Sequence, residues 1–190
     1  MTAAEQLFEQ AHTAYAFDPT PLPADTAEQI MDLAKWAPTA MNAQPLRMAA
    51  VHTPQAKARL IPLLDEANRV KAEQAPLNLI LAADLDFHEH LPTIAPHSPG
   101  AKESFAEDAK RHTFARNQAW LQAGYVILAI RTRGLAAGPM AGFDKAGVDA
   151  EFFADEPWSS FVVVNVGYPA ADAFRPRSPR LDPAVTVRHV

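Results

Sequence analysis

Proline is the residue that most limits how this chain can fold, because the sequence has 17 prolines against only seven glycines. Proline lacks a backbone N–H and fixes φ, so it interrupts the interior of a helix or of a central strand. Three groups of prolines therefore mark places where regular structure should stop. They are Pro19, Pro21 and Pro23, then Pro92, Pro96 and Pro99, and finally Pro169, Pro176, Pro179 and Pro183.

Between these prolines, the spacing of apolar residues predicts helices and short strands. Asp25 with Glu28 approximates a capping box, and Thr53-Pro54 is typical of an N-cap with proline at the first helical position. The expected helices are Ala3–Ala14, Asp25 to just before Pro38, Thr53–Leu64, Ser104–Arg133 with a break or bend near Thr113, and Asp144–Phe153. The expected strands are Met48–Val51, Leu77–Ala83 and Ser160–Val166, and residues 84–100 are expected to form a loop with a helical turn.

The second half of the long helix, AWLQAGYVILAI (119–130), is apolar on nearly all sides, with Gln122 as its one clearly polar residue. A helix of this kind is buried on most faces, either in a core or in a subunit interface. Gly134 follows it and is a natural residue to end the helix. Three or four short strands among five or six helices predict an α+β or α/β fold, and the length of 190 residues fits a single domain, 1–190.

Composition excludes several classes of function. Lys and Arg total 17 and Asp and Glu total 22, so a net charge of −5 argues against a nucleic-acid partner. The chain has no cysteine, which removes disulfides, thiolate nucleophiles and Cys-ligated metal centres. The acidic N-terminus does not resemble a signal peptide, and the most apolar segment is too short for a membrane span. These features predict a cytoplasmic protein without a membrane partner.

Motif spelling excludes further enzyme classes. The chain has no GxSxG, no P-loop and no GxG, so a serine hydrolase, a P-loop NTPase and a Rossmann dinucleotide site are not expected. His88, His90 and His97 lie near Asp84, Asp86 and Glu89, a composition that could bind a metal. Because HExxH spacing is missing and the segment reads as a loop, we expect no metal and favour exposed loop histidines.

Three segments carry polar or flexible residues that suit a ligand, and each also has an ordinary structural interpretation. In WAPTAMNAQP (36–45), Asn42 and Gln44 could hydrogen-bond a heteroaromatic ring edge or merely satisfy nearby backbone groups. The segment 134–144 could bring backbone close to a ligand at Gly138 and Gly142, or could simply connect two helices. After VGYP (166–169), three arginines could clamp a phosphate or form a solvated tail.

Together and in this order, the three segments resemble the FMN-dependent nitroreductase family, over about residues 5–182. WAPTAMNAQP is similar to the family's APSxxNxQP turn, GLAAGPMAGFD (134–144) to its GLGxxxxxGFD segment, and VGYP with a following arginine to its C-terminal signature. The resemblance implies an α+β, three-layer α/β/α sandwich with a mixed, mostly antiparallel central sheet. It also implies an intertwined homodimer joined through the helix around Trp120–Ile130, with a pocket built between the two subunits.

The resemblance further implies FMN as cofactor, NAD(P)H as electron donor and ping-pong transfer of hydride to a small acceptor. FMN carries the chemistry, and no side chain is assigned as catalytic. The backbone N–H of Ala141 is expected near flavin N5, Asn42 and Gln44 at the pyrimidine edge, and Arg177 and Arg180 at the phosphate. The full set of implied FMN contacts is His12, Thr13, Pro38, Thr39, Asn42, Gln44, Pro139, Met140, Ala141, Gly142, Arg177 and Arg180.

One departure from the family concerns the phosphate. The typical N-terminal arginine cluster is absent, because the aligned stretch is AHTAY (11–15) and no arginine precedes Arg47. The phosphate contacts would then fall on Arg177 and Arg180, with help from His12 or Thr13.

Within the family, the malonic semialdehyde reductase branch is the most similar, through KWAPTAMN (35–42), Leu91–His97, Phe114–Asn117, Ala137–Asp144 and Ser178–Leu181. This likeness predicts an aldehyde acid as acceptor, with His97, Arg47, Arg111 and Arg116 as candidate partners of its carboxylate. A broad nitroaromatic or quinone reductase and a flavin-binding protein without turnover are the alternatives.

Overall fold

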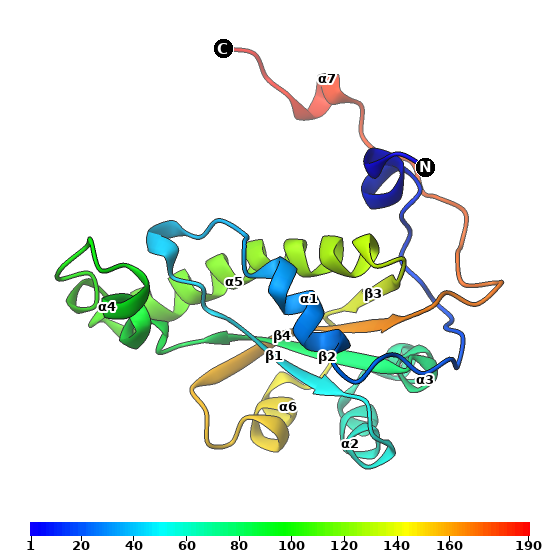
Figure 1. The fold of residues 1–190 in the computed structure, drawn as a ribbon, viewed down its shortest axis with the longest axis horizontal. Helices are drawn as coiled ribbons and strands as arrows, with labels where there is room; N and C mark the ends of the chain where they lie inside the picture. Colours follow the sequence, from blue (N-terminus) through cyan, green and yellow to red (C-terminus); the bar gives the residue numbers. More distant parts are fainter.

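The computed structural model describes residues 1–190 as a four-stranded sheet covered by helices on both faces (Figure 1). The strands are β1 (Leu46–Val51), β2 (Leu77–Asp84), β3 (Ala136–Met140) and β4 (Trp158–Gly167), in the spatial order β1-β2-β4-β3. All three strand pairs are antiparallel. The one parallel pairing is an isolated bridge between Thr13 and Ala137, which adds the N-terminal segment to the outer edge of β3.

Helices form the two outer layers. α1 (Thr26–Ala34) and the long α5 (Asp108–Thr132) cover one face of the sheet, and α2 (Pro54–Leu60), α3 (Glu66–Gln74) and α6 (Lys145–Phe152) cover the other (Figure 1). The core is divided in the same way, with a larger buried cluster on the α5 side and a smaller one on the α2–α6 side. The expected three-layer α+β sandwich is therefore confirmed.

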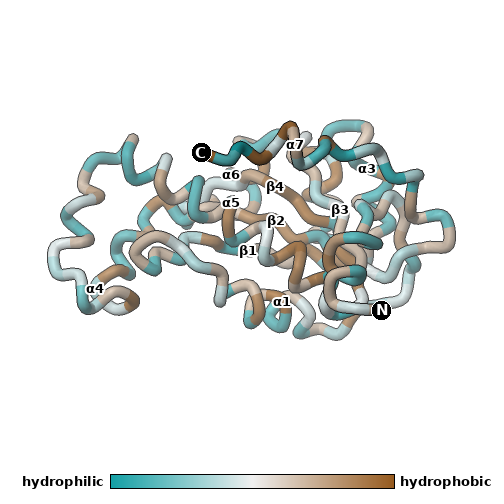
Figure 2. Tube along the Cα trace, turned by 90° about the horizontal axis from the view of Figure 1, so that it is seen from above, coloured by the Kyte–Doolittle hydropathy of each residue, from teal (hydrophilic) through white to brown (hydrophobic).

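Short helical segments lie in the connections and near the two ends of the chain. They are η1 (Glu5–Glu9), η2 (Ala40–Asn42), η3 (Ile61–Leu63), η4 (Phe87–His90), α4 (Leu91–Ile94), η5 (Glu103–Phe105) and α7 (Pro183–Thr186). Apolar residues gather in the sheet and along α5, and hydrophilic residues are frequent in the outlying loops, whereas the C-terminal tail mixes both kinds (Figure 2). None of the helices is long and apolar enough to cross a bilayer.

Local capping signals were read correctly from the sequence at three places. The Oγ1 atom of Thr53 accepts from the backbone N–H of Ala56 at 3.2 Å, with Pro54 beginning α2. The carboxylate of Asp144 accepts from the N–H of Gly147 at 3.0 Å, which starts α6. Gly134 follows α5 with φ of +71°, a conformation that glycine adopts without strain.

Several expected boundaries are wrong. The N-terminal helix ends at Glu9 rather than Ala14, because the chain then extends and Ala14 N–H donates to Ala137 O at 3.2 Å. α5 begins at Asp108 rather than Ser104 and continues without a break through Thr113. The capping box does not form either, since the Asp25 carboxylate accepts from Gln29 Nε2 instead of a backbone N–H.

α3 was missed in the sequence because it lacks an apolar stripe. Its sequence is EANRVKAEQ, and only Ala72 is buried. A helix that is polar on nearly all sides shows no periodic pattern of apolar residues. The one buried residue, Ala72, is too small to mark a buried face in the sequence. The helix expected to end at Leu64 stops at Leu60 and continues as η3, which contains Pro62.

Candidate functional site

The WAPTAMNAQP turn contains three non-glycine residues in the left-handed region of backbone conformation. Met41, Asn42 and Gln44 have φ values of 58°, 53° and 43°. Each such residue costs free energy, so the surrounding contacts must hold the turn in place. Gln118 of α5 accepts from the N–H of Ala40 at 2.8 Å, and Thr39 Oγ1 accepts from the N–H of Gln44 at 3.2 Å. Strained backbone of this kind is typical of functional sites.

The two amides of this turn also bond to one another. Gln44 Nε2 donates to Asn42 Oδ1 at 2.9 Å, and Asn42 Nδ2 donates to the carbonyl of Ile94 in α4 at 2.8 Å. In this structure the two amides therefore satisfy nearby groups of the chain itself. Both side chains lie at an exposed turn, and the Oε1 atom of Gln44 accepts no hydrogen bond from the chain.

A second group of expected site residues meets beside the last turn of α5. His12 and Thr13 lie beside Arg177 and Arg180 in a cavity of about 420 Å³. The cavity lining contains no Asp or Glu, and it is completed by Ala11, Tyr15, Arg131, Arg175, Pro176 and Ser178. Segments that are more than 160 residues apart in the chain therefore form one cationic pocket, here called the basic pocket.

Backbone carbonyls and aromatic rings hold the side chains of the basic pocket. Arg177 donates to the carbonyls of Glu9 and Ala11 at 2.7 and 2.8 Å. The guanidinium of Arg175 lies 4.1 Å from the ring centre of Tyr15, and Lys71 approaches the same ring at 5.5 Å. Partial burial lowers the pKa of Lys71, and the charge of Arg175 lowers it further. The pocket thus concentrates positive charge that an anion would neutralise.

The end of β3 offers a third feature, a pair of free backbone donors. No atom of the chain accepts a hydrogen bond from the N–H of Ala141 or Gly142. Asn68 Nδ2 fixes this loop by donating to the carbonyl of Gly142 at 2.8 Å. A side chain at position 142 would meet the carboxylate of Asp65, which would have to move to admit it. Ala141 is an exposed residue.

Pro139 and Met140, which precede these donors, are less accessible. Met140 is buried, and its sulfur accepts from Asn165 Nδ2 at 3.6 Å, so only its backbone can face a ligand. Pro139 is half-buried at the edge of the sheet. The expected contacts along 139–142 are therefore backbone contacts.

The strained turn and the basic pocket do not meet within one chain. The strained turn is attached to Gln118, and the basic pocket includes Arg131, thirteen residues further along α5 (118 to 131). The helical rise separates these two points by about 20 Å. Figure 1 shows η2 near one end of the long helix and the N-terminal segment and β3 near the other. Pro38, Thr39, Asn42 and Gln44 are thus separated from the candidate FMN contacts in the basic pocket.

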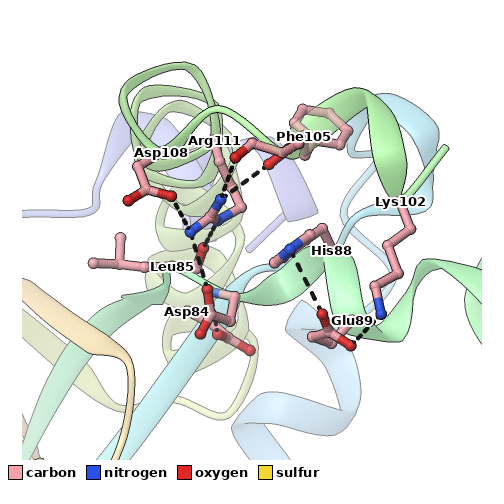
Figure 3. Close-up of polar contacts among 10 residues, drawn as sticks. Asp84, Leu85, His88, Glu89, Lys102, Phe105, Asp108 and Arg111 are labelled. Atoms are coloured by element: carbon pink, nitrogen blue, oxygen red, sulfur yellow. Dashed lines mark hydrogen bonds and ion pairs between the residues drawn. The ribbon is translucent and has the colours of Figure 1, made fainter.

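Two of the four arginine and histidine candidates for the acceptor are occupied by structural contacts. Arg47 forms an ion pair of 2.6 Å with the buried Asp84 and donates to the carbonyls of Gln44 and Leu46. Arg111 is buried, donates to the carbonyls of Leu85 and Phe105, and pairs with Asp108 at 2.8 Å (Figure 3). Arg116 donates to Ser159 at 2.9 Å and remains exposed, as does His97.

The histidines after β2 do not form a metal centre, since no three His, Asp or Glu side chains converge as ligands. Glu89 instead bonds Lys102 at 2.6 Å and lies 3.6 Å from His88 (Figure 3). The hydrogen bond from Lys102 lowers the pKa of the Glu89 carboxyl. His90 is 3.5 Å from Asp84.

Comparison with known proteins identifies the family and agrees with the fold. Residues 9–168 match the model of the nitroreductase family, and the chain belongs to this family. It is 52% identical over 180 residues to a Streptomyces coelicolor protein named a candidate NADH dehydrogenase/NAD(P)H nitroreductase, covering 94% of this chain and 89% of the relative. A Leptothrix cholodnii protein of the same name is 48% identical, covering 95% and 92%.

Solved structures share the fold at low sequence identity. A candidate nitroreductase from Exiguobacterium sibiricum, crystallised in complex with FMN, is 19% identical with a TM-score of 0.84, covering 100% of this chain and 98% of that chain. An enone reductase of gut-bacterial fatty acid saturation metabolism has the same identity and TM-score, covering 99% and 97%.

Two residues at these sites escaped the sequence analysis. Gln118, which holds the turn, and Arg131, which lines the basic pocket, both lie on α5. Neither belongs to a local motif, because each contacts a segment that is remote in the sequence. The apolar pattern of the helix does not distinguish them from its other polar residues.

Proposed function

We propose that the protein binds FMN and transfers reducing equivalents from NAD(P)H to a small acceptor. The observation that carries this proposal is the pairing of a cationic pocket at the start of β3 with free N–H donors at its end. Ala137 and Ala141 are four residues apart, about 13 Å along an extended strand. This spacing suits the ribityl chain that joins the flavin ring of FMN to its phosphate. The FMN in the Exiguobacterium structure and the names of the close relatives support the same function.

The proposed contacts follow from the geometry of one chain. Arg177, Arg180, His12 and Thr13 would bind the phosphate, because they line the basic pocket. The N–H groups of Ala141 and Gly142 would face the flavin ring, where a fixed donor can stabilise added electron density. Pro139 and Met140 would contribute backbone. Bound FMN supplies hydride exchange, so the chain needs no nucleophile of its own.

We further propose that the homodimer completes the site. Pro38, Thr39, Asn42 and Gln44 lie about 20 Å along α5 from the basic pocket, so a second copy of the chain would supply them. On α5, Trp120, Leu121 and Tyr125 are 47%, 45% and 39% exposed, a large apolar surface for a monomer.

The C-terminal tail also suits an intertwined dimer. The end of the tail, including α7, leads away from the body of the molecule (Figure 1). Leu181, Val185 and Val187 are exposed there, and a second copy of the chain would cover these apolar side chains in the proposed dimer.

For the acceptor, a nitroaromatic or a quinone suits the site better than malonic semialdehyde. An aldehyde acid requires a cation for its carboxylate, and two of the four candidates, Arg47 and Arg111, are engaged in internal contacts. Arg116 and His97 remain as the groups that could recognise malonic semialdehyde. The names of the relatives also point to nitro compounds.

Reconstitution tests the function directly. The purified protein is incubated with FMN, freed of excess flavin and supplied with NADH or NADPH. We expect a flavin absorption spectrum and steady oxidation of the nicotinamide with a nitroaromatic or quinone. A protein that retains FMN and shows no turnover with any acceptor would be a flavin-binding protein. Comparison of kcat/KM for malonic semialdehyde, a nitroaromatic and a quinone identifies the acceptor class.

A further inference from the structure

Arg131 is a half-buried cation in the last turn of α5 that has no carboxylate partner. It is absent from every ion pair of the chain, whereas the buried Arg111 has two acidic neighbours. A partly buried charge without a counter-charge is unfavourable, so its position needs an explanation. Its side chain lines the basic pocket together with His12 and three arginines of the tail.

The contacts of Arg131 use only part of its hydrogen-bonding capacity. One guanidinium nitrogen donates to the carbonyl of Leu7 at 2.7 Å, and the backbone carbonyl of Arg131 accepts from Gln6 Nε2 at 2.9 Å. The other N–H groups of the guanidinium have no acceptor in the chain. An arginine can present several donors to one phosphate in a fixed geometry, so the unused donors suit an anion.

The electrostatic surroundings of Arg131 point in the same direction. Partial burial lowers the pKa of Arg131, and the nearby charge of Arg177 lowers it further. Both effects disfavour the cation in the free protein. A bound anion would relieve both, because it would provide the missing counter-charge.

Arg131 differs from the other cations of the pocket in its attachment. Arg175, Arg177 and Arg180 are exposed and lie in a tail without helix or strand, and no arginine precedes Arg47 in the sequence. Arg131 is therefore the one permanent cation that a regular element holds in the pocket. A donor on a rigid element is preorganised and loses less conformational freedom when it binds.

We propose that Arg131 is a phosphate-binding residue of this protein, which supplies from α5 the fixed cation that the N-terminal segment lacks. The inference rests on the proposed FMN site and adds to it a residue that no motif of the chain includes. The phosphate of the cofactor would lie between Arg131 on the helix and the arginines of the tail.

The test compares FMN with riboflavin, which lacks the phosphate. Dissociation constants for both are measured by flavin fluorescence for the wild-type protein, Arg131→Met and Arg131→Lys. We expect Arg131→Met to weaken FMN binding about 10- to 100-fold, the scale of a charged hydrogen bond, and to leave riboflavin binding within about twofold. Arg131→Lys should recover part of the loss. Arg133→Met, which removes an exposed arginine two residues away, should bind FMN like the wild type.

A structural role for Arg131 predicts a different result. Loss of the bond to Leu7 could release the N-terminal segment and distort the pocket indirectly. Gln6→Leu removes the other bond between this segment and Arg131 without changing the guanidinium. The proposal is overturned if Gln6→Leu weakens FMN binding as much as Arg131→Met, if riboflavin binding falls in parallel, or if Arg131→Met binds FMN like the wild type.

The same proteins separate this inference from the proposed function. If the wild-type protein binds no flavin, the proposed function fails, and thermal unfolding with inorganic phosphate still tests the pocket. A phosphate-dependent rise in Tm that disappears in Arg131→Met supports the role of Arg131. An equal rise in both proteins, or no rise in either, contradicts it.

Discussion

Gln118 and Ala40 lie 78 residues apart in the chain, and a hydrogen bond of 2.8 Å joins Gln118 Oε1 to the backbone N–H of Ala40. This bond ties the strained turn at Met41–Gln44 to the middle of α5, the helix whose exposed apolar residues suit a dimer interface. The geometry of the turn and the packing of the helix are therefore linked through one side chain.

We expect Gln118→Leu to weaken FMN binding about two- to tenfold, because the turn loses one of the bonds that offset its strain. Gln118→Glu keeps an acceptor at the same place and should bind FMN more tightly than Gln118→Leu. Fluorescence titration measures both constants. Gln74→Leu, at an exposed glutamine of α3 without side-chain hydrogen bonds, is the matched control. Equal affinities of the two Gln118 variants would contradict the proposed link.

The ion pair between Arg47 and Asp84 predicts a structural role for Arg47. The side chain of Asp84 is 4% exposed, so Arg47→Met would leave a buried carboxylate without its partner. We expect a loss of about 3–5 kcal/mol in the free energy of unfolding, measured with urea. Lys35→Met, which breaks an exposed pair with Asp32, should cost less than about 1 kcal/mol. A stable Arg47→Met protein with a raised KM for a carboxylate acceptor would instead assign Arg47 to the substrate.

The surface of α5 predicts the oligomeric state. Leu121→Arg with Tyr125→Arg places two charges on the exposed apolar face, and we expect the dimer to dissociate and FMN to be lost with it. Sedimentation at micromolar concentration measures the change. Val70→Arg adds a charge at a 66% exposed valine of α3 and should remain dimeric. A wild-type protein that sediments as a monomer would rule out the proposed interface.

The lowered pKa of Lys57 predicts that its contribution to stability depends on pH in the alkaline range. Burial lowers the pKa of Lys57 below its usual value of 10.5, and its ammonium donates to the carbonyls of Glu73 and Ala75. Between the lowered pKa and 10.5, the unfolded chain binds more protons at this site than the folded chain. The contribution of Lys57 to the free energy of unfolding therefore rises with pH in that window.

Urea unfolding at several pH values from 8 to 10.5 measures this contribution as the difference between the wild-type protein and Lys57→Met. We expect the wild-type stability to gain relative to the variant as pH rises. A difference that is constant or falls with pH would show that the folded state does not lower the pKa of Lys57.

The sequence by itself determined the segments that carry local signals. Thr53 with Pro54, Asp144 and Gly134 were readable as helix ends, because each acts on backbone within a few residues. β2 and β4 were readable because buried strands are short apolar runs between breaks. The order of three motifs indicated the nitroreductase family before any contact was known.

Only the tertiary structure decided how these segments act together. Residues 11–14 leave the helical path because β3 provides a strand edge for them, and α3 forms although its own sequence has little apolar pattern. The placement of Arg131 beside the tail arginines depends on where α5 ends in relation to the N-terminal segment. Contacts between residues more than a hundred positions apart leave no local periodicity, so packing of the whole chain was needed to bring the basic pocket together.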